Sequence, residues 1–324
     1  FKLSTPVAAQ IDPIHIDICL AMFRASSVNT VGLCHSHQAC VPELLAELGM
    51  PWDGVSYKIS GINHMAWLLE ISRNGEDLYP IIRKRAQEGP IYAPTLALRE
   101  LHPEYADRIP SVAEQFTPDN HHDMVRFEIM KQFGYFVTES SEHSSEYYPW
   151  FIKKDHPELI DRFHIPLDEY PRRCRDQIAR WKQQAEHLVH NENLTHTRSS
   201  EYAAGIIEAL ETGRTFGFAG NVLNTGLIDN LPFDACVEVS CMVNEGHLSP
   251  CHMGPLPNQL AALNRRQIEV HQLTVDAALT RKKEYIYQAA MLDPHAGSEL
   301  TIDEIRSLVD DLIQAHGDWL PEYH

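Results

Sequence analysis

The chain has 324 residues, 44% of them hydrophobic and 22% charged, which is typical of a folded globular protein. Its formal net charge of -18 excludes a basic surface for phosphate backbones or anionic lipid, so we expect neither nucleic-acid nor membrane partners. The sequence has no run of 18 or more apolar residues, so no membrane-spanning helix is expected.

The N-terminal segment and the cysteines indicate the compartment. Residues 1–13 lack a basic stretch followed by an apolar core, so no secretory signal is expected. The missing initial methionine indicates a fragment or a processed product. The seven cysteines are odd in number, irregularly spaced and without a CxxC pair. This pattern favours free thiols in a reducing, cytoplasmic environment.

The first predicted elements form a strand–loop–helix unit. A β-type pattern covers residues 29–33, and a helical pattern with apolar residues at 41, 44, 45 and 48 follows. A second strand is predicted at residues 55–60, with residues 66–72 as its continuation or as a partner strand. Cys34 and His64 follow these two strands. Because ligands collect at the carboxyl ends of strands in α/β proteins, we expect a site there.

The remainder of the chain is predicted to be largely helical. Helical patterns occupy residues 123–134 and 171–190, a polar loop follows at 190–200, and residues 234–243 predict a buried strand. A long helical pattern then runs from about residue 256 to residue 292. The last helix begins with a capping box made by Thr301 and Glu304. We expect these C-terminal helices to form core or a subunit interface.

Three groups of residues could carry chemistry, and each has a structural alternative. Cys34 and His64 could form half of a metal site or could be buried structural residues. Residues 138–150 are rich in Glu, His, Tyr and Trp, which could transfer protons and stack on sugar rings, or could form a solvated loop. Asn221 and Asn230 could contact sugar hydroxyls or form turns. The sequence has no glycine-rich phosphate loop, so cofactor-binding residues are not identified.

Six collinear segments together resemble glycoside hydrolase family four, and within it the branch of bacterial α-galactosidases. They are residues 31–36, 60–67, 138–150, 226–232, 291–295 and 315–321. The resemblance implies a fold between α/β and α+β. It implies a remnant of a Rossmann-type NAD domain at residues 1–35, with most of that domain missing. Residues 36–324 would then form a mixed α+β catalytic and oligomerisation domain, like that of family-four glycosidases related to lactate and malate dehydrogenases.

The resemblance also implies a mechanism that needs NAD and Mn²⁺. In this family the sugar is oxidised at C3, the C2 proton is removed, the leaving group is eliminated, water adds and the hydride returns. The positions of the family's metal ligands match Cys34 and His64. His35 replaces the Asp of the phospho-glycosidase branches, which implies an unphosphorylated α-galactoside substrate and a role for His35 in leaving-group departure.

Further site residues follow from the same resemblance. The proton-abstracting base of related branches is a Tyr in the region of residues 138–148, so His143 and Tyr147 are the candidates, with Glu142 and Glu146 as helpers. The substrate-binding candidates are Asn63, Glu142 and Asp12. Asp12 stands in an Asp12-Pro13 pair where the family has Asn-Pro.

The predicted function is therefore α-galactoside hydrolysis by a cytoplasmic homodimer or homotetramer. Several alternatives stay open at this point. The substrate could be an α-galacturonide or an α-glucoside. The chain could be a non-catalytic fragment that lacks the NAD-binding half. A small-molecule dehydrogenase, or a zinc hydrolase that uses Cys34 and His64, would also account for some of these residues.

Overall fold

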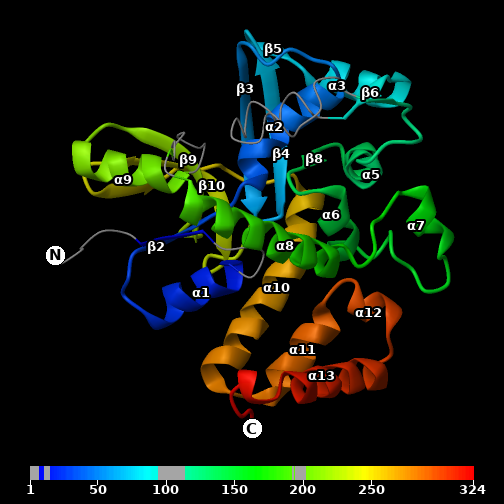
Figure 1. Cartoon of the computed structure of the whole chain (residues 1–324), viewed down its shortest axis with the longest axis vertical. Helices are drawn as coiled ribbons and strands as arrows, with labels where there is room; N and C mark the ends of the chain where they lie inside the picture. The colour runs from blue at the N-terminus through cyan, green and yellow to red at the C-terminus, as the bar shows by residue number, and fades with distance from the viewer. Residues whose placement is uncertain (1–6, 11–14, 94–113, 192, 194–201) are drawn as a thin grey trace.

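The protein, described here by a computed structural model, is built on one mixed sheet with helices on both faces (Figure 1). The structure describes residues 7–10, 15–93, 114–191, 193 and 202–324. Within them, nine strands form this sheet, and β1 and β2 are its parallel pair. This arrangement confirms the predicted class between α/β and α+β.

The order of the strands differs from their order in the chain. The main path of the sheet runs through β1 (Val7–Gln10), β2 (Thr30–Leu33), β9 (Phe216–Leu223), β10 (Cys236–Asn244), β3 (Val55–Ile62), β4 (Met65–Arg73) and β5 (Glu76–Asp77). Two further strands pair with this path, β11 (His247–Pro250) with β10 and β8 (Phe136–Val137) with β4. A separate pair is formed by β6 (Ile91–Tyr92) and β7 (Gln115–Phe116). Since β2 joins the same sheet as β9, the predicted division of the chain at residue 35 falls inside one continuous sheet and stays a prediction.

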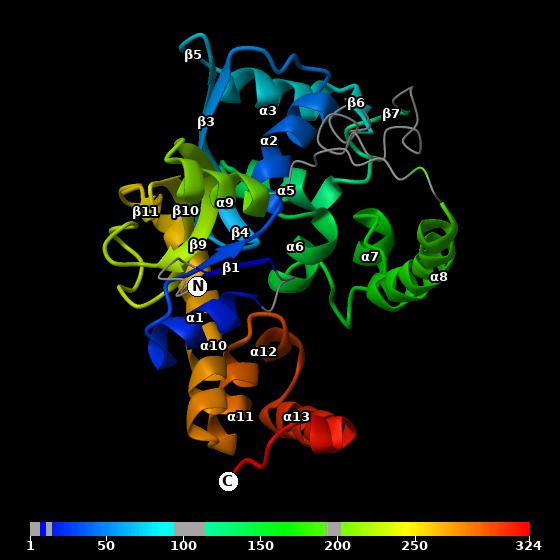
Figure 2. The same cartoon turned by 60° about the vertical axis from the view of Figure 1, so that its left-hand side comes forward.

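The helices cover the sheet and extend below it (Figure 2). They are α1 (His15–Ala25), α2 (Ser36–Glu47), α3 (Tyr79–Glu88), α5 (Met124–Phe133), α6 (Ser141–Tyr147), α7 (Glu158–Arg162), α8 (Glu169–His190), α9 (Tyr202–Thr212), α10 (Asn258–Thr280), α11 (Lys283–Leu292), α12 (Ala296–Glu299) and α13 (Ile302–His316), followed by a 3₁₀ turn at Gly317–Trp319. In the described part of the chain, no helix is long and apolar enough to cross a membrane. All seven cysteines are free thiols.

Strand β4 shows how the sequence divides the interior into two cores. Met65 and Trp67 pack in the larger core, whereas Ala66 and Leu68 pack in the smaller one. Alternate residues of a strand point to opposite faces, so an unbroken apolar run is what a strand buried on both sides requires. Residues 66–72 are thus the partner strand of β3, joined to it by a two-residue turn.

Helix α10 is attached to β4 by one buried polar side chain. The Asn264 amide nitrogen donates to the backbone oxygen of Met65 at 2.8 Å, and its Oδ1 accepts from the Trp67 indole at 3.3 Å. Both interactions satisfy groups that would otherwise be buried without partners. They fix the position of α10 relative to the hairpin of β3 and β4.

The predicted helical stretch from residue 256 to residue 292 is helical almost throughout, but it forms two helices. Helix α10 ends at Thr280, and Arg281 adopts a left-handed conformation with φ of 63° before α11 begins. This break places α11 beside α10. Neither glycine nor proline marks it, so the sequence carried no signal for it. The predicted loop at 190–200 lies largely outside the described residues.

The capping box predicted for the last helix is present. Thr301 Oγ1 accepts from the Glu304 backbone N–H at 3.3 Å, and the Glu304 carboxylate accepts from the Thr301 N–H at 2.8 Å. We expect Thr301→Ala to lower the free energy of unfolding by about 1 kcal/mol, because an N-terminal N–H of α13 loses its acceptor. Chemical denaturation would measure this. Thr301→Ser keeps the oxygen and should unfold like the wild type; equal losses in both variants would contradict the role of the cap.

Candidate metal centre and active site

Cys34 lies between the end of β2 and the start of α2. Its side chain is half-buried, and Sγ lies 3.6 Å from the Ser36 Oγ. The unpaired backbone N–H groups at the start of a helix favour negative charge nearby. This position therefore suits a thiolate, which is the form of cysteine that binds metals.

His64 occupies the turn between β3 and β4 and is 7% exposed. Its backbone φ of 63° lies in the left-handed region, which residues other than glycine seldom adopt and which is found preferentially at functional positions. The hairpin closes tightly, because a Cβ added to Gly61 would lie 2.7 Å from the Ala66 Cα. The turn brings the His64 Nε2 to 3.5 Å from the Cys34 Sγ.

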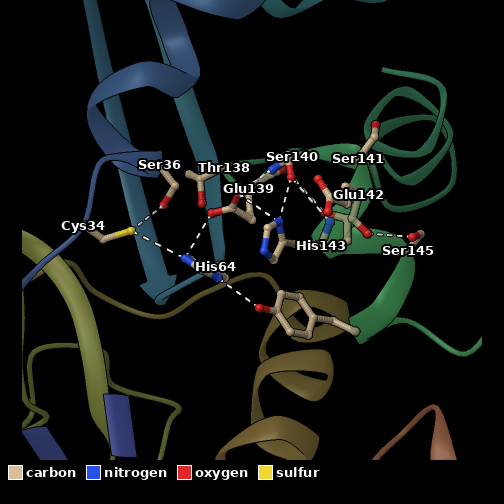
Figure 3. Close-up of polar contacts among 12 residues, drawn as sticks. Cys34, Ser36, His64, Thr138, Glu139, Ser140, Ser141, Glu142, His143 and Ser145 are labelled. Carbon is tan, nitrogen blue, oxygen red and sulfur yellow. Dashed lines mark hydrogen bonds and ion pairs between the residues drawn. The ribbon is translucent and has the colours of Figure 1, made fainter. Parts of the chain in front are cut away.

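Glu139 completes the group of donors (Figure 3). It follows β8, which is held to β4 by strand pairing and by a 3.0 Å hydrogen bond from the Thr138 N–H to the Ala66 oxygen. The Glu139 Oε2 lies 3.1 Å from the His64 Nε2. The donor atoms of Cys34, His64 and Glu139 all lie within 4.8 Å of one another, and no other three His, Cys, Asp or Glu side chains in the described ranges do so.

This set of donors fits a divalent transition metal. It combines a thiolate, an imidazole and a carboxylate, of which the carboxylate suits Mn²⁺ and the other two also accept Zn²⁺ or Fe²⁺. The second nitrogen of His64, Nδ1, lies 2.9 Å from the Tyr147 hydroxyl. Metal-binding histidines are normally oriented through their other nitrogen in this way. The residues present are therefore suited to hold an ion.

Helix α6 brings both candidates for the proton-abstracting base to His64. The ring centroids of His143 and Tyr147 lie 5.6 and 6.1 Å from that of His64. Ser140 caps the helix by accepting from the His143 N–H, and its Oγ lies 3.0 Å from the His143 Nδ1. Burial raises the pKa of Tyr147, and the nearby charge of Glu139 raises it further.

Two cavities meet at Tyr147. The inner cavity, of about 220 Å³, is lined by Ile16, Asp17, Asn63, His64, Met65, Tyr147, Gln267, Val270, His271 and Thr274. The outer cavity, of about 390 Å³, is lined by residues that include Glu142, His143, Glu146, Tyr147, Tyr170 and Arg173. The predicted substrate residues Asn63 and Glu142 therefore lie in different cavities, on either side of the predicted base.

A buried carboxyl group lies beneath the donors. Glu238 of β10 is 0% exposed and stands opposite Gly61 on β3 and Asn221 on β9. Gly32 on β2 stands opposite Asn221, so these four residues form a row across one face of the sheet.

The environment of Glu238 is unusual for an acid. Burial raises the pKa of Glu238 to about 8, the charge of Cys34 adds to this rise, and His64 opposes it. The Asn63 amide also lowers this pKa, although the two groups do not meet in hydrogen-bond geometry, and neither Glu238 oxygen has a hydrogen-bond partner among the described residues. A cation bound by Cys34 and His64 would stabilise the charged form of this acid.

The other predicted residues are not all brought to the centre. His35 is exposed in the N-cap position of α2, and Asp12 lies outside the described residues. Asn230 is bonded to the backbone of Leu256 through both its amide nitrogen and its oxygen, and so holds a turn. The amide of Asn221 donates to the Gly32 oxygen at 3.4 Å within the sheet.

Three acids at the centre escaped the sequence analysis as individual site residues. Glu139 lies inside the acid-rich segment 138–150, but nothing distinguishes it there from Glu142 and Glu146. Glu238 and Asp17 had a usable signal, since each is a lone acid within an otherwise apolar stretch of strand or helix. A charge at such a position is costly unless it has a function or a partner.

Comparisons with known proteins agree on one family. Residues 59–296 match the family described as the family 4 glycosyl hydrolase C-terminal domain. An alpha-galactosidase of Bacillus subtilis is 54% identical over 94% of this chain, and one of Rhizobium meliloti is 30% identical over 94%. An alpha-galacturonidase of Bacillus subtilis is 26% identical over 89%. The chain spans only 64%, 58% and 62% of the length of these relatives.

Solved structures show the same fold. A 6-phospho-alpha-glucosidase from gut microorganisms, in complex with NAD and Mn²⁺, superposes with a TM-score of 0.70 at 18% identity, covering 98% of this chain and 68% of the other. The 6-phospho-beta glucosidase of Thermotoga maritima superposes with a TM-score of 0.67 at 17% identity, covering 98% and 66%.

Proposed function

Because the chain belongs to family 4 of the glycosyl hydrolases, we propose that it forms the metal-binding and catalytic part of an α-galactosidase that requires NAD and Mn²⁺. The observation that carries the proposal is the meeting of Cys34, His64 and Glu139 at one end of the sheet. The 54% identity to an alpha-galactosidase, against 26% to an alpha-galacturonidase, favours galactosides as substrates. The NAD and Mn²⁺ named with the 6-phospho-alpha-glucosidase support the cofactors.

The metal donors and the residues of α6 have separate roles in this proposal. Cys34, His64 and Glu139 would hold the ion, which would supply Lewis-acid stabilisation of negative charge on the sugar, and NAD would accept and return a hydride. If Nε2 of His64 faces the ion, its Nδ1 carries the proton and donates to the Tyr147 oxygen. This hydrogen bond favours the phenolate form of Tyr147, whose oxygen would take a proton from the sugar only after losing its own hydroxyl proton. His143 and Glu142 line the outer cavity next to Tyr147.

The free thiols and the exposed apolar side chains support the predicted compartment and oligomer. A metal-binding thiolate among free cysteines suits a reducing cytoplasm. Exposed apolar side chains on α8 and α13 supply surfaces for the predicted homodimer or homotetramer; they include Ile178, Trp181, Val189, Leu308 and Leu312.

Titration of the reduced protein with Mn²⁺, followed by the EPR signal of the free ion, tests the proposal. We expect one tightly bound ion in the wild type and an affinity at least about tenfold lower in Cys34→Ala, His64→Asn and Glu139→Gln. Asn is chosen at position 64 because it tolerates the left-handed backbone.

Matched controls are Cys251→Ala and Glu158→Gln, which remove the same groups away from the donors and should bind Mn²⁺ like the wild type. A wild type that binds no Mn²⁺ would contradict the proposal, as would controls that lose as much affinity as the three variants. With the ion bound, NAD-dependent release of galactose from an aryl α-galactoside is the next measurement.

A further inference from the structure

Helix α8 has an apolar face that the described part of the chain leaves exposed. None of its residues is buried there, and Figure 2 shows the helix at the outer side of the molecule, away from the sheet. Ile178 is 58% exposed and Trp181 is 61% exposed. Apolar side chains recur along the helix at intervals of three and four residues, which places them on one face. This apolar stripe consists of Tyr170, Cys174, Ile178, Trp181, Ala185 and Leu188.

Cations border the apolar stripe on both sides. At about 100° per residue, Arg175 and Lys182 fall beside one edge of the stripe. Arg173 and Arg180 fall beside the other edge. The helix carries five cations and three acids, in a chain whose net charge is -18. The stripe therefore fits an acidic partner surface that has apolar side chains at its centre.

The charge of the whole chain favours a protein partner over a membrane. A basic amphipathic helix can lie on anionic lipid. The remainder of this chain, however, carries a large excess of acids, and an anionic membrane would repel it. A second copy of the chain is the partner that these charges favour, because it brings its own acidic surface to the basic helix.

The C-terminal segment, residues 301–324, has the complementary surface. It holds six acids and one cation, Arg306. Leu308 and Leu312 stand one turn apart on α13, and both are exposed. Trp319, in the 3₁₀ turn that follows α13, is 92% exposed. In a two-fold dimer the α8 helix of each copy would meet the C-terminal segment of the other, so the contact would occur twice.

We propose that the apolar stripe of α8 binds the C-terminal segment of a second copy of this chain, and that this contact covers the outer cavity beside Tyr147. Tyr170 belongs to the stripe and also lines that cavity, as does Arg173 at the edge of the stripe. A helix laid along the stripe therefore reaches residues of the cavity wall. The covering of the cavity rests on the proposed function, because Tyr147 belongs to the proposed active site.

Sedimentation velocity on the full chain tests the contact. We expect the wild type to be a dimer at about 10 μM. Trp181→Glu, Ile178→Glu and Leu312→Glu should each raise the Kd of the dimer at least about tenfold, because each puts a charge into an apolar contact. Phe233→Glu is the matched control, since Phe233 is an exposed apolar residue on the turn before β10. It should dimerise like the wild type, and all four variants should bind Mn²⁺ like the wild type.

Carbodiimide cross-linking in an equal mixture of ¹⁵N-labelled and unlabelled protein locates the contact. We expect Lys182, the only lysine of α8, to join an acid of residues 301–324 in peptides of mixed label, which only two chains can form. Lys283 and Asp310, which pair within one chain, are the internal control. In hydroxyl-radical footprinting, Tyr170 should be several-fold less reactive in the wild-type dimer than in Trp181→Glu.

A wild type that is monomeric at that concentration, or α8 variants that dimerise like it, would overturn the proposal. A monomer that binds vesicles of phosphatidylserine and phosphatidylcholine through Trp181 would also overturn it, as would a Lys182 cross-link outside residues 301–324. Equal reactivity of Tyr170 in dimer and monomer would overturn the covering of the outer cavity. All these results leave Mn²⁺ binding unchanged, whereas a wild type that dimerises as expected but binds no Mn²⁺ would contradict the proposed function and support the contact.

Discussion

Replacing Arg126 with methionine is expected to lower the free energy of unfolding by about 3–5 kcal/mol, because it leaves buried acids without their cation. Arg126 is 3% exposed, and its guanidinium lies 3.2 Å from the Asp123 carboxylate and 3.7 Å from that of Glu43. Burial alone would lower the pKa of Arg126, but the charge of Asp123 raises it, so the side chain stays charged.

The same side chain holds the segment that carries Glu139. Its Nε donates to the Val137 oxygen and its Nη2 to the Thr138 oxygen, both at 3.2 Å. The backbone N–H of Arg126 donates to the hydroxyl of Ser141, two residues beyond Glu139. Since Glu43 belongs to α2, which follows Cys34, Arg126 links the segments of two metal donors. We therefore expect Arg126→Lys, which keeps the charge but not both carbonyl bonds, to fold with a reduced affinity for Mn²⁺.

Urea unfolding and the Mn²⁺ titration would measure the two effects separately. Arg83→Met is the matched control, because Arg83 also donates to a backbone oxygen, that of Gly134 at 2.7 Å, but lies exposed. Arg83→Met should lower the free energy of unfolding by less than about 1 kcal/mol. If Arg126→Met loses no more stability than Arg83→Met, the buried network does not stabilise the fold. If Arg126→Lys binds Mn²⁺ like the wild type, Arg126 does not position Glu139.

The elements that the sequence predicted well are those with a strong local pattern. The apolar run of β4 and the capping box of α13 depend on residues close together in the chain, and both are present. The break at Arg281 depends instead on the packing of α11 beside α10, which no local residue marks. The short helix α6 was a second case, since its composition of Ser, Glu and His suits a solvated loop as well as a helix.

In the candidate site too, the residues with a local sequence pattern could be predicted, and those that depend on strand pairing could not. Cys34 and His64 could be proposed because each follows a recognisable strand and because six segments resemble one family. Glu139 could not be singled out, and Glu238, although it is a lone acid in an apolar strand, could not be placed near His64. Their approach to His64 depends on β8 pairing with β4 and on β10 lying between β9 and β3. Neither pairing can be deduced from local sequence, because these strands are far apart in the chain.

Glu238→Gln is expected to make the metal-free protein more stable at alkaline pH and, at the same time, to weaken Mn²⁺ binding. The pKa of Glu238 is raised from 4.5 to about 8 in the folded state. The folded protein therefore holds this proton more tightly than the unfolded chain, and the resulting stability is fully present below pH 4.5 and is lost as the pH rises through about 8. Glutamine has no charge to bury, so the variant should gain up to about 5 kcal/mol over the wild type by pH 9 and little at pH 4.5.

The expected loss of Mn²⁺ affinity also comes from the charge of Glu238. This charge destabilises the metal-free fold but attracts a bound cation. A divalent ion held by Cys34, His64 and Glu139 would favour the charged Glu238, so removing that charge should weaken binding by about tenfold. Urea unfolding at pH 5, 7 and 9 and the Mn²⁺ titration would measure both effects, with Glu269→Gln on the exposed face of α10 as the control. A stability difference between Glu238→Gln and wild type that does not change with pH would show that the carboxyl titrates normally, and unchanged Mn²⁺ affinity would show that its charge does not reach the ion.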